Sequence, residues 1–294
     1  MASGITIYIV GSMASGKTTL INAIMGNKLL PYASNASISI EYSDIDNFRG
    51  VAYGQDAKEI KKGDNISRHT LREWVQDNRL SSITVTGRIP FISPLNMNIR
   101  IVEVSSALWT EHRFDIIENT LGERAFIIFV YPVDRLMNTC ELGLIKTIAQ
   151  IGNNRVYKGL FFVVNRMDVL NPKEDDINKV LCNYKDFLSN CGIKIPAIFP
   201  ISAQAALEAR TKPKVQLVLP VYRQFIKHYP STHYDAYYQF SHLPNLIRIE
   251  TEHYLKEAEN NQNREDGECT AIEIHSGIMS LEKAISLSLN KIHY

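Results

Sequence analysis

Short runs of β-branched and aromatic residues recur along the first two thirds of the chain, and segments of helical composition follow them. The first run, residues 5–10, leads through a glycine-bounded loop into residues 17–25, which predicts a strand, a loop and a helix. The same pattern predicts further strands at 83–87, 99–104, 125–130, 160–164 and 197–201, and helices at 113–121, 140–150 and 174–191. This alternation is typical of a doubly wound α/β fold with a mostly parallel sheet.

Two stretches interrupt the alternation. Residues 27–50 and 52–81 are polar with weak periodicity, and we interpret them as loop and variable insertion with one helix around 67–78. After residue 210 the pattern predicts helices at 215–229, 246–261 and 277–292, with a loop over the polar run 259–268. We therefore expect a domain at 1–210 and a helical extension at 211–294 that packs on it.

Composition narrows the class of ligand. The chain has 294 residues, 45% of them hydrophobic, which is enough for one large core. Lys and Arg number 32 against 31 Asp and Glu, so the net charge of +1 creates no general attraction for nucleic acid. A small ligand or a protein partner is the better expectation.

Four widely spaced cysteines form no CxxC pair and have no histidine at metal-ligand spacing, which argues against a zinc site. The first ten residues read as a buried strand and carry no basic segment typical of a signal peptide. No apolar run approaches the roughly 20 residues that span a bilayer. These features predict a soluble, cytoplasmic protein.

Residues 11–18, GSMASGKT, fit the phosphate-binding pattern GxxxxGK[ST] and lie between the first predicted strand and helix. In such a loop the backbone N–H groups converge on phosphates, Lys17 reaches the β- and γ-phosphates, and the Thr18 hydroxyl binds Mg²⁺. The alternative is a chance Gly/Ser turn. The predicted nucleotide contacts here are Gly11, Ser12, Met13, Ala14, Ser15, Gly16, Lys17, Thr18 and Thr19.

A second motif predicts which base is bound. Asn165, Arg166 and Asp168 fit the guanine-reading pattern NKxD, with Arg in the Lys position. The Asp168 carboxylate would accept two hydrogen bonds from guanine that adenine cannot donate, while the stem of Arg166 would cover the base. Ser202 and Ala203 resemble the SAK loop that meets the guanine O6. Each motif alone is weak, but both follow successive strands in the expected order.

With these loops in place, the chain resembles the GTPase domain of dynamin-like proteins, especially bacterial ones. The matching stretches are IYIVGSMASGKTTLINAIMGNKLLP (7–31), RAFIIFVYPVD (124–134), LFFVVNRMD (160–168) and IFPISAQAAL (198–207). HSGIMSLEKAI (275–285) looks like the helix that closes such domains. The resemblance implies binding of GTP, GDP and Mg²⁺, a homodimer across the nucleotide face, and a protein partner such as a larger dynamin-like protein.

The chain departs from the family in three places. Where the family has DTPG, whose Asp contacts Mg²⁺ through water, this chain has Glu103-Val104-Ser105-Ser106; Glu103 can serve as the acid, but the glycine is missing. Ser37 or Ser39 would have to replace the switch-one threonine, unless both are ordinary loop serines. Met13 and Ala14 replace the Gln and Ser that assist cleavage in eukaryotic dynamins. The predicted catalytic residues are Lys17, Ser37 or Ser39, and Glu103, and the three departures together predict slow hydrolysis.

The tail is too short for the stalk and membrane-binding tip of a full dynamin. Residues 246–261 mix acidic and basic side chains, so we expect no autonomous membrane insertion. Residues 229–240 carry four tyrosines and form either a partner surface or a packed connection between helices. No Ser/His/Asp or Cys/His grouping is visible.

Three hypotheses follow. The first is a Mg²⁺-dependent GTPase, and the second is a GTP-binding scaffold that no longer hydrolyses; the stretch from Glu103 to Ser106 separates them. The third, an ATP-dependent kinase or ATPase, requires Asp168 to be irrelevant and predicts a preference for ATP.

Overall fold

A computed structural model describes the chain over residues 4–32, 36–92, 98–104, 125–135, 139–154, 159–171, 174–194, 196–211, 245–260 and 265–290. Several predictions lie outside these ranges: the helices at 113–121 and 215–229, the tyrosine-rich segment 229–240, and Ser105 and Ser106.

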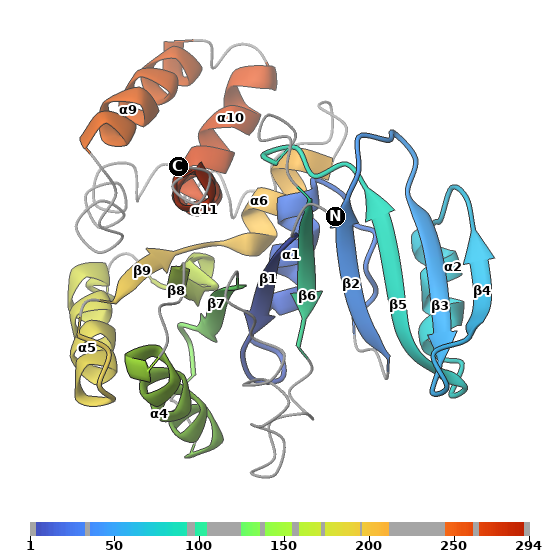
Figure 1. The fold of residues 1–294 in the computed structure, drawn as a ribbon. Coiled ribbons are helices and arrows are strands. Elements are labelled where there is room, and N and C mark those ends of the chain that lie inside the picture. The colour runs from blue at the N-terminus through green and yellow to red at the C-terminus, as the bar shows by residue number, and fades with distance from the viewer. Residues whose placement is uncertain are drawn as a thin grey trace.

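A nine-stranded sheet organises the molecule, in the order β4-β3-β5-β2-β6-β1-β7-β8-β9 (Figure 1). Strands pair in parallel from β6 to β9 and between β2 and β5, whereas β3 is antiparallel to both its neighbours and β2 is antiparallel to β6. The strands are β1 Ile5–Val10, β2 Ser37–Tyr42, β3 Arg49–Gly54, β4 Glu59–Gly63, β5 Leu80–Gly87, β6 Ile99–Glu103, β7 Ala125–Pro132, β8 Gly159–Asn165 and β9 Ala197–Pro200. The predicted mostly parallel α/β fold is confirmed.

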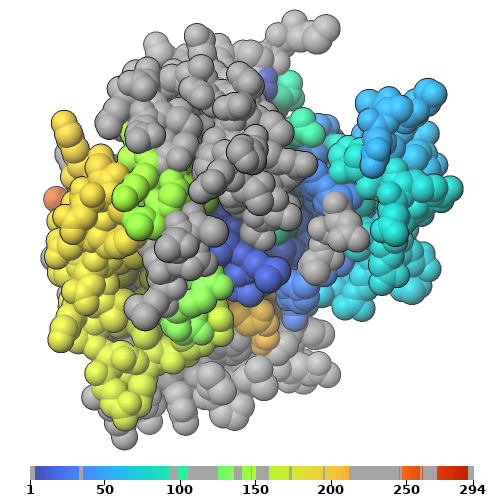
Figure 2. Space-filling model, turned by 90° about the horizontal axis from the view of Figure 1, so that it is seen from below, coloured from blue at the N-terminus to red at the C-terminus, as the bar shows by residue number. Residues whose placement is uncertain are grey.

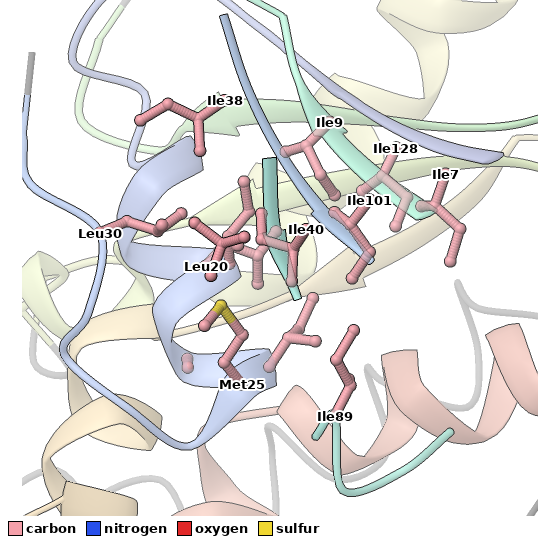
Figure 3. Packing of buried hydrophobic residues seen from close by; sticks show 14 of the residues in the cluster. Ile7, Ile9, Leu20, Met25, Leu30, Ile38, Ile40, Ile89, Ile101 and Ile128 are labelled. Atoms are coloured by element: carbon pink, nitrogen blue, oxygen red, sulfur yellow. The ribbon is translucent and has the colours of Figure 1, made fainter. Parts of the chain in front are cut away.

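Helices cover both faces of this sheet. The helices are α1 Lys17–Met25, α2 Arg68–Val75, α4 Thr139–Asn154, α5 Ile177–Asn190, α6 Ala203–Thr211, α9 Asn245–Asn260, α10 Glu265–His275 and α11 Ile278–Asn290, with a 3-10 turn η3 at Met167–Val169. One core cluster joins alternate residues of β1 to α1, α2, α6 and α11, and a second joins the opposite face of the sheet to α4 and α5. Figure 3 shows Ile7, Ile9 and Leu20 in the first cluster.

The strand β7 explains why the sheet is doubly covered. All eight of its residues are buried, as expected of a central parallel strand with helices on both faces. Its Phe126 and Ile128 belong to the first cluster, whereas Ile127 and Phe129 belong to the second. This central position fixes the strand ends that carry the predicted motifs.

The interpretation of residues 27–50 and 52–81 as loop with one helix is wrong in part. These stretches also contain β2, β3 and β4, while the predicted helix is present as α2, capped by Ser67. The composition of these segments is untypical of strands. β3 contains Gly50 and Gly54, and β4 is an edge strand with mostly exposed residues. Pairing with β5 and β2 stabilises them in place of intrinsic propensity.

The C-terminal helices also differ from expectation at one point. The run 259–268, predicted as a loop, is helical from Glu265, where α10 begins. Its polar composition hides a helix that packs against α6 and α9. The predicted last helix is present as α11, and Ile278, Leu281 and Ile285 are buried in the same cluster as α1. The division of the chain at residue 210 stays a prediction.

Candidate nucleotide site

The phosphate loop and the two predicted base-reading segments lie at one edge of the sheet. The strands β1, β6, β7, β8 and β9 run parallel, so their carboxyl ends meet at that edge. Figure 2 shows the molecule from the side of this edge. The N-terminal segment, in dark blue, reaches the surface near the centre of the view, beside green segments from the middle of the chain. The topology therefore brings together loops that are far apart in the sequence.

Glycines shape the loop between β1 and α1. Gly11 has φ 151°, and a Cβ there would lie 2.3 Å from the carbonyl oxygen of Val130. Gly16 has φ 92°, and a Cβ there would lie 2.2 Å from Nδ2 of Asn165. The N-terminus of α1 has no side-chain cap, so its amides point at the loop interior as a phosphate site requires.

Lys17 spans this loop. Its Nζ donates hydrogen bonds to the carbonyl oxygens of Gly11 at 2.9 Å and Ser12 at 2.8 Å. Burial lowers the pKa of Lys17, the nearby Glu103 carboxylate opposes that shift, and Arg135 adds to it. The ammonium group is thus positioned across the loop, where a phosphate oxygen is a better-matched acceptor than a carbonyl.

The first residue of α1 that carries a hydroxyl meets the end of β6. Thr18 Oγ1 donates a hydrogen bond to Glu103 Oε1 at 2.8 Å. Burial raises the pKa of Glu103, and the Thr18 hydrogen bond and the Lys17 charge oppose this shift. A hydroxyl and a carboxylate are hard oxygen ligands suited to Mg²⁺.

The described part of the chain contains no cluster of three or more His, Cys, Asp or Glu residues that could hold a metal by themselves. The pair Thr18 and Glu103 therefore fits an ion that takes most of its ligands from phosphate and water, as Mg²⁺ does beside nucleotides. Both predicted metal residues are brought together by the fold.

Asn165 connects three loops. Its Nδ2 donates to the carbonyl oxygen of Ser15 at 3.0 Å, and its Oδ1 accepts from the backbone N–H of Ala203 at 3.1 Å. Because Asn165 is buried at the end of β8, this amide fixes the phosphate loop against both predicted base-reading segments.

The base-reading segments lie side by side. The Ser202 hydroxyl donates to Asp168 Oδ1 at 2.5 Å, and the Met167 N–H donates to the carbonyl of Ile201 at 3.1 Å. Arg166 has φ 67° and pairs with Asp134, which follows β7, at 3.0 Å. The sequence-predicted residues Asn165, Asp168, Ser202 and Ala203 thus form one constellation.

The serines predicted for switch one are placed differently. Ser39 lies in β2, where its hydroxyl is 3.2 Å from Thr84 Oγ1 and accepts from the Arg100 guanidinium at 3.0 Å. Ile38 and Ile40 occupy the core on the α1 side, so Ser37 and Ser39 project from the opposite face by strand alternation. Neither serine has a described hydrogen bond to Thr18 or Glu103, although Ile38 between them pairs with Glu103 across β2 and β6, so their role in the site stays a prediction.

Sequence reasoning missed Arg135. Its Nη1 donates to the carbonyl of Met13 at 3.1 Å, its Nη2 donates to the Ser12 hydroxyl, and the same Nη2 contacts Glu141 Oε1 at 2.7 Å. No motif marks this position. Its place just after β7, beside the phosphate loop, was the available signal.

Fold and site together define the class. The chain has the P-loop α/β fold of a dynamin GTPase domain, with the phosphate loop, the Asn165 loop and the Ser202 loop at one edge. It superposes on two solved structures of an oligomerised bacterial dynamin pair, described as providing a mechanism for the long-range sensing and tethering of membranes. The TM-scores are 0.54 and 0.55 at 15% identity, over 88% of this chain and 51% and 50% of those chains.

No protein-family model matches the chain. It is 26% identical over 219 residues to the uncharacterized protein in the xynA 3′ region of Caldicellulosiruptor sp. (strain Rt8B.4), covering 72% of this chain and 52% of that protein. The chain thus spans about half the length of the proteins it matches. Among the described helices, none combines the length and the apolar character needed to cross a bilayer.

Proposed function

We propose that this protein binds GTP and GDP together with Mg²⁺ and hydrolyses GTP slowly. The observation that carries the proposal is the Asn165 side chain, which holds Ser15 of the phosphate loop and Ala203 of the second base-reading loop. A phosphate loop alone serves many nucleotides. Its attachment to a segment that presents Asp168 favours guanine, because only guanine donates two hydrogen bonds to one carboxylate.

The roles of the remaining residues follow from their positions. The amides of the Gly11–Lys17 loop and the Lys17 ammonium would bind the phosphates, and Thr18 and Glu103 would hold Mg²⁺ directly or through water. When bound, Mg²⁺ supplies charge neutralisation between the β- and γ-phosphates. Glu103 accepts from Thr18 in the described arrangement, so the metal would replace that hydrogen bond.

Slow turnover is the expectation because few groups at the site can orient the attacking water. Met13 and Ala14 bear no polar side-chain atom, and the Ser39 hydroxyl is engaged by Thr84 and Arg100 on the other face of the sheet. These observations support binding more strongly than fast hydrolysis.

The experiment is a binding and single-turnover assay on the purified chain. We expect tight binding of GTP and GDP with Mg²⁺, weak binding of ATP, and phosphate release that falls to background in Lys17→Ala. Lys58→Ala is the matched control because Lys58 is exposed and pairs with Asp56 in the insertion. A preference for ATP over GTP would overturn the proposal.

A second candidate is a GTP-binding scaffold without hydrolysis. The absence of polar groups at Met13 and Ala14 favours it, together with the placement of Ser37 and Ser39. In that case the wild type binds GTP, and its phosphate release equals that of Lys17→Ala.

We further propose that the nucleotide face mediates self-association or binds a protein partner. A larger dynamin-like protein is one candidate for that partner. The support is the likeness of fold to structures of an oligomerised bacterial dynamin pair. This chain covers about half the length of those proteins, and membrane tethering is a property described for them.

A further inference from the structure

An arginine lies against the phosphate loop from outside it. Arg135 follows β7 and reaches the carbonyl of Met13 and the hydroxyl of Ser12, two residues of the turn that would wrap the nucleotide phosphates. The Tyr131 hydroxyl donates to the carbonyl oxygen of Arg135, which fixes the main chain at this point. The guanidinium is therefore held in position by the fold.

A buried carboxylate holds the other side of this guanidinium. Glu141, in the first turn of α4, accepts from Arg135 Nη2 at 2.7 Å, and its side chain is 2% exposed. Nε of Arg135 is buried and has no acceptor within the described ranges. The guanidinium thus retains a donor for a further ligand at the phosphate loop.

Two cations converge on this loop. Lys17 donates to the carbonyl oxygen of Ser12 and Arg135 donates to the hydroxyl of the same residue, so the two positive groups lie close together. Among the described residues, Glu103 and Glu141 supply negative charge beside them. A nucleotide triphosphate is the kind of ligand that such an arrangement favours. In GTPases, an arginine beside the loop stabilises the charge that develops as the terminal phosphate is transferred.

We propose that Arg135 is a catalytic arginine supplied within the chain, which Glu141 orients and which contacts the terminal phosphate of bound GTP. In the reaction a water oxygen bonds to the γ-phosphorus and the bond to the bridging oxygen breaks, leaving its electron pair on GDP. The water proton passes to solvent, and Arg135 stays protonated throughout. This inference rests on the proposed GTP binding. In it, Arg135 compensates for the missing polar groups at Met13 and Ala14.

The test compares Arg135→Ala with the wild type in single-turnover hydrolysis. We expect the rate to fall roughly 25-fold, the ratio between GTPases with and without such an arginine in the same chain. The affinity for GDP should stay unchanged, and retention of the GDP–aluminium fluoride complex should be lost. Added guanidinium chloride should restore part of the rate, which a purely structural role would not allow.

Two further variants keep the test decisive. Arg248→Ala removes an exposed arginine that pairs with Glu252 on α9, and it should behave as the wild type. Arg135→Lys serves if Arg135→Ala fails to fold, because it keeps the charge and loses the planar fork, and it should also turn over slowly.

The outcomes separate this inference from the proposed function. A wild type that binds no guanine nucleotide overturns both. A wild type that hydrolyses GTP while Arg135→Ala matches it overturns the arginine alone. If the wild type binds GTP without turnover, capture of GDP–aluminium fluoride decides: capture that depends on Arg135 supports the inference, and either no capture or equal capture by both proteins overturns it.

Discussion

Glu103 is a half-buried carboxylate with two opposing effects: it can help to bind Mg²⁺, and its charge is disfavoured by burial. Its raised pKa means that the folded state holds the proton more tightly than the unfolded state does. Its contribution to stability is therefore present at low pH and is lost as pH rises through the folded pKa. The ionised carboxylate favours Mg²⁺ and disfavours the nucleotide-free fold.

Glu103→Gln should show both effects. Without nucleotide, we expect its Tm to exceed that of the wild type at neutral pH, with the difference shrinking toward acid pH. With nucleotide, its affinity for Mg²⁺ should fall about 10- to 100-fold, as for other groups that position a metal through water or hydrogen bonds. Glu59→Gln on the edge strand β4 is the control and should change neither quantity. Unchanged Mg²⁺ dependence in Glu103→Gln would remove Glu103 from the metal site.

Asp168 should decide the base. Asp168→Asn replaces one acceptor with a donor, which faces the donating amine of guanine, and it makes the remaining hydrogen bond a neutral one. GTP affinity should therefore fall about 100-fold. The same amide matches the C2 carbonyl of xanthine, so affinity for XTP should rise. Titration with fluorescent nucleotides measures both. Asp186→Asn, exposed on α5, should retain the wild-type preference; retention by Asp168→Asn as well would contradict the role of Asp168.

At the residue scale, the sequence predicted those site residues whose role depends on neighbours in the same short segment of chain. The glycines, Lys17 and Thr18 act within one turn of chain, and Asn165 and Asp168 within one loop. Arg135 reaches the phosphate loop only because β7 pairs with β1, a contact between distant segments that no spacing reveals. The face on which Ser39 projects depends on β2 being a strand, which its composition did not indicate.

Among the elements, α10 carries a pH-sensitive group. Burial lowers the pKa of His275 to about 4 from 6.5. Because the folded pKa is depressed, its contribution to stability is present above the unfolded pKa and is lost as pH falls through the folded value. We expect the wild type to lose about 3 kcal/mol of unfolding free energy from this group between pH 6.5 and 4. Urea titrations at several pH values should show that loss reduced in His275→Gln and unchanged in the exposed control His253→Gln.

Three helices meet at a buried ion cluster. Arg210 of α6 contacts Glu273 of α10 at 2.9 Å and Glu282 of α11 at 2.6 Å, and it donates to the carbonyl of Ala23 in α1 at 2.8 Å. Burial raises the pKa of Glu282, and Arg210 opposes that shift. The cluster links the helix after the phosphate loop to the C-terminal helices.

Arg210→Met should destabilise the protein by about 3 kcal/mol because it leaves the buried Glu282 carboxylate and the partly buried Glu273 carboxylate without their cation. The double variant Arg210→Met/Glu282→Leu should recover part of this loss, since it removes one of the two charges. The exposed control Arg248→Met should cost less than about 1 kcal/mol. Urea midpoints measure all three, and an Arg210→Met midpoint equal to that of the control would contradict a stabilising role of the cluster.

The elements differed in how well they could be predicted. The continuous apolar runs of β7 and β8 identify central parallel strands, because a strand covered on both faces buries successive residues, as all of β7 and the last five residues of β8 are. The strands β2 to β4 lack such runs and depend on cross-strand partners. The start of α10 within a polar run depends likewise on α6 and α9, against which it packs.

At the scale of the molecule, the Ser202 loop contacts the C-terminal helices directly, since the Ser202 N–H donates to the carbonyl oxygen of Ser276 at 2.8 Å. The phosphate loop lies farther from those helices (Figure 1). The helix α1 runs between them, from the phosphate loop to the carbonyl of Ala23 that Arg210 contacts. A change at the nucleotide that shifts α1 would thus reach α6, α10 and α11 through packed and hydrogen-bonded contacts.

Two exposed apolar side chains at the nucleotide edge allow a test of the proposed self-association. Met13 in the phosphate loop is 75% exposed, and Val169 beside Asp168 is 44% exposed. With Mg²⁺ and GDP–aluminium fluoride we expect a dimer by light scattering after size exclusion, and a monomer with GDP. Val169→Glu should prevent the dimer by placing a charge in the contact. Ile249→Glu alters an apolar residue on α9 that is also exposed, and this variant should still dimerise. A monomer in every nucleotide state would rule out association through this face, whereas loss of the dimer only in Ile249→Glu would move the contact to α9.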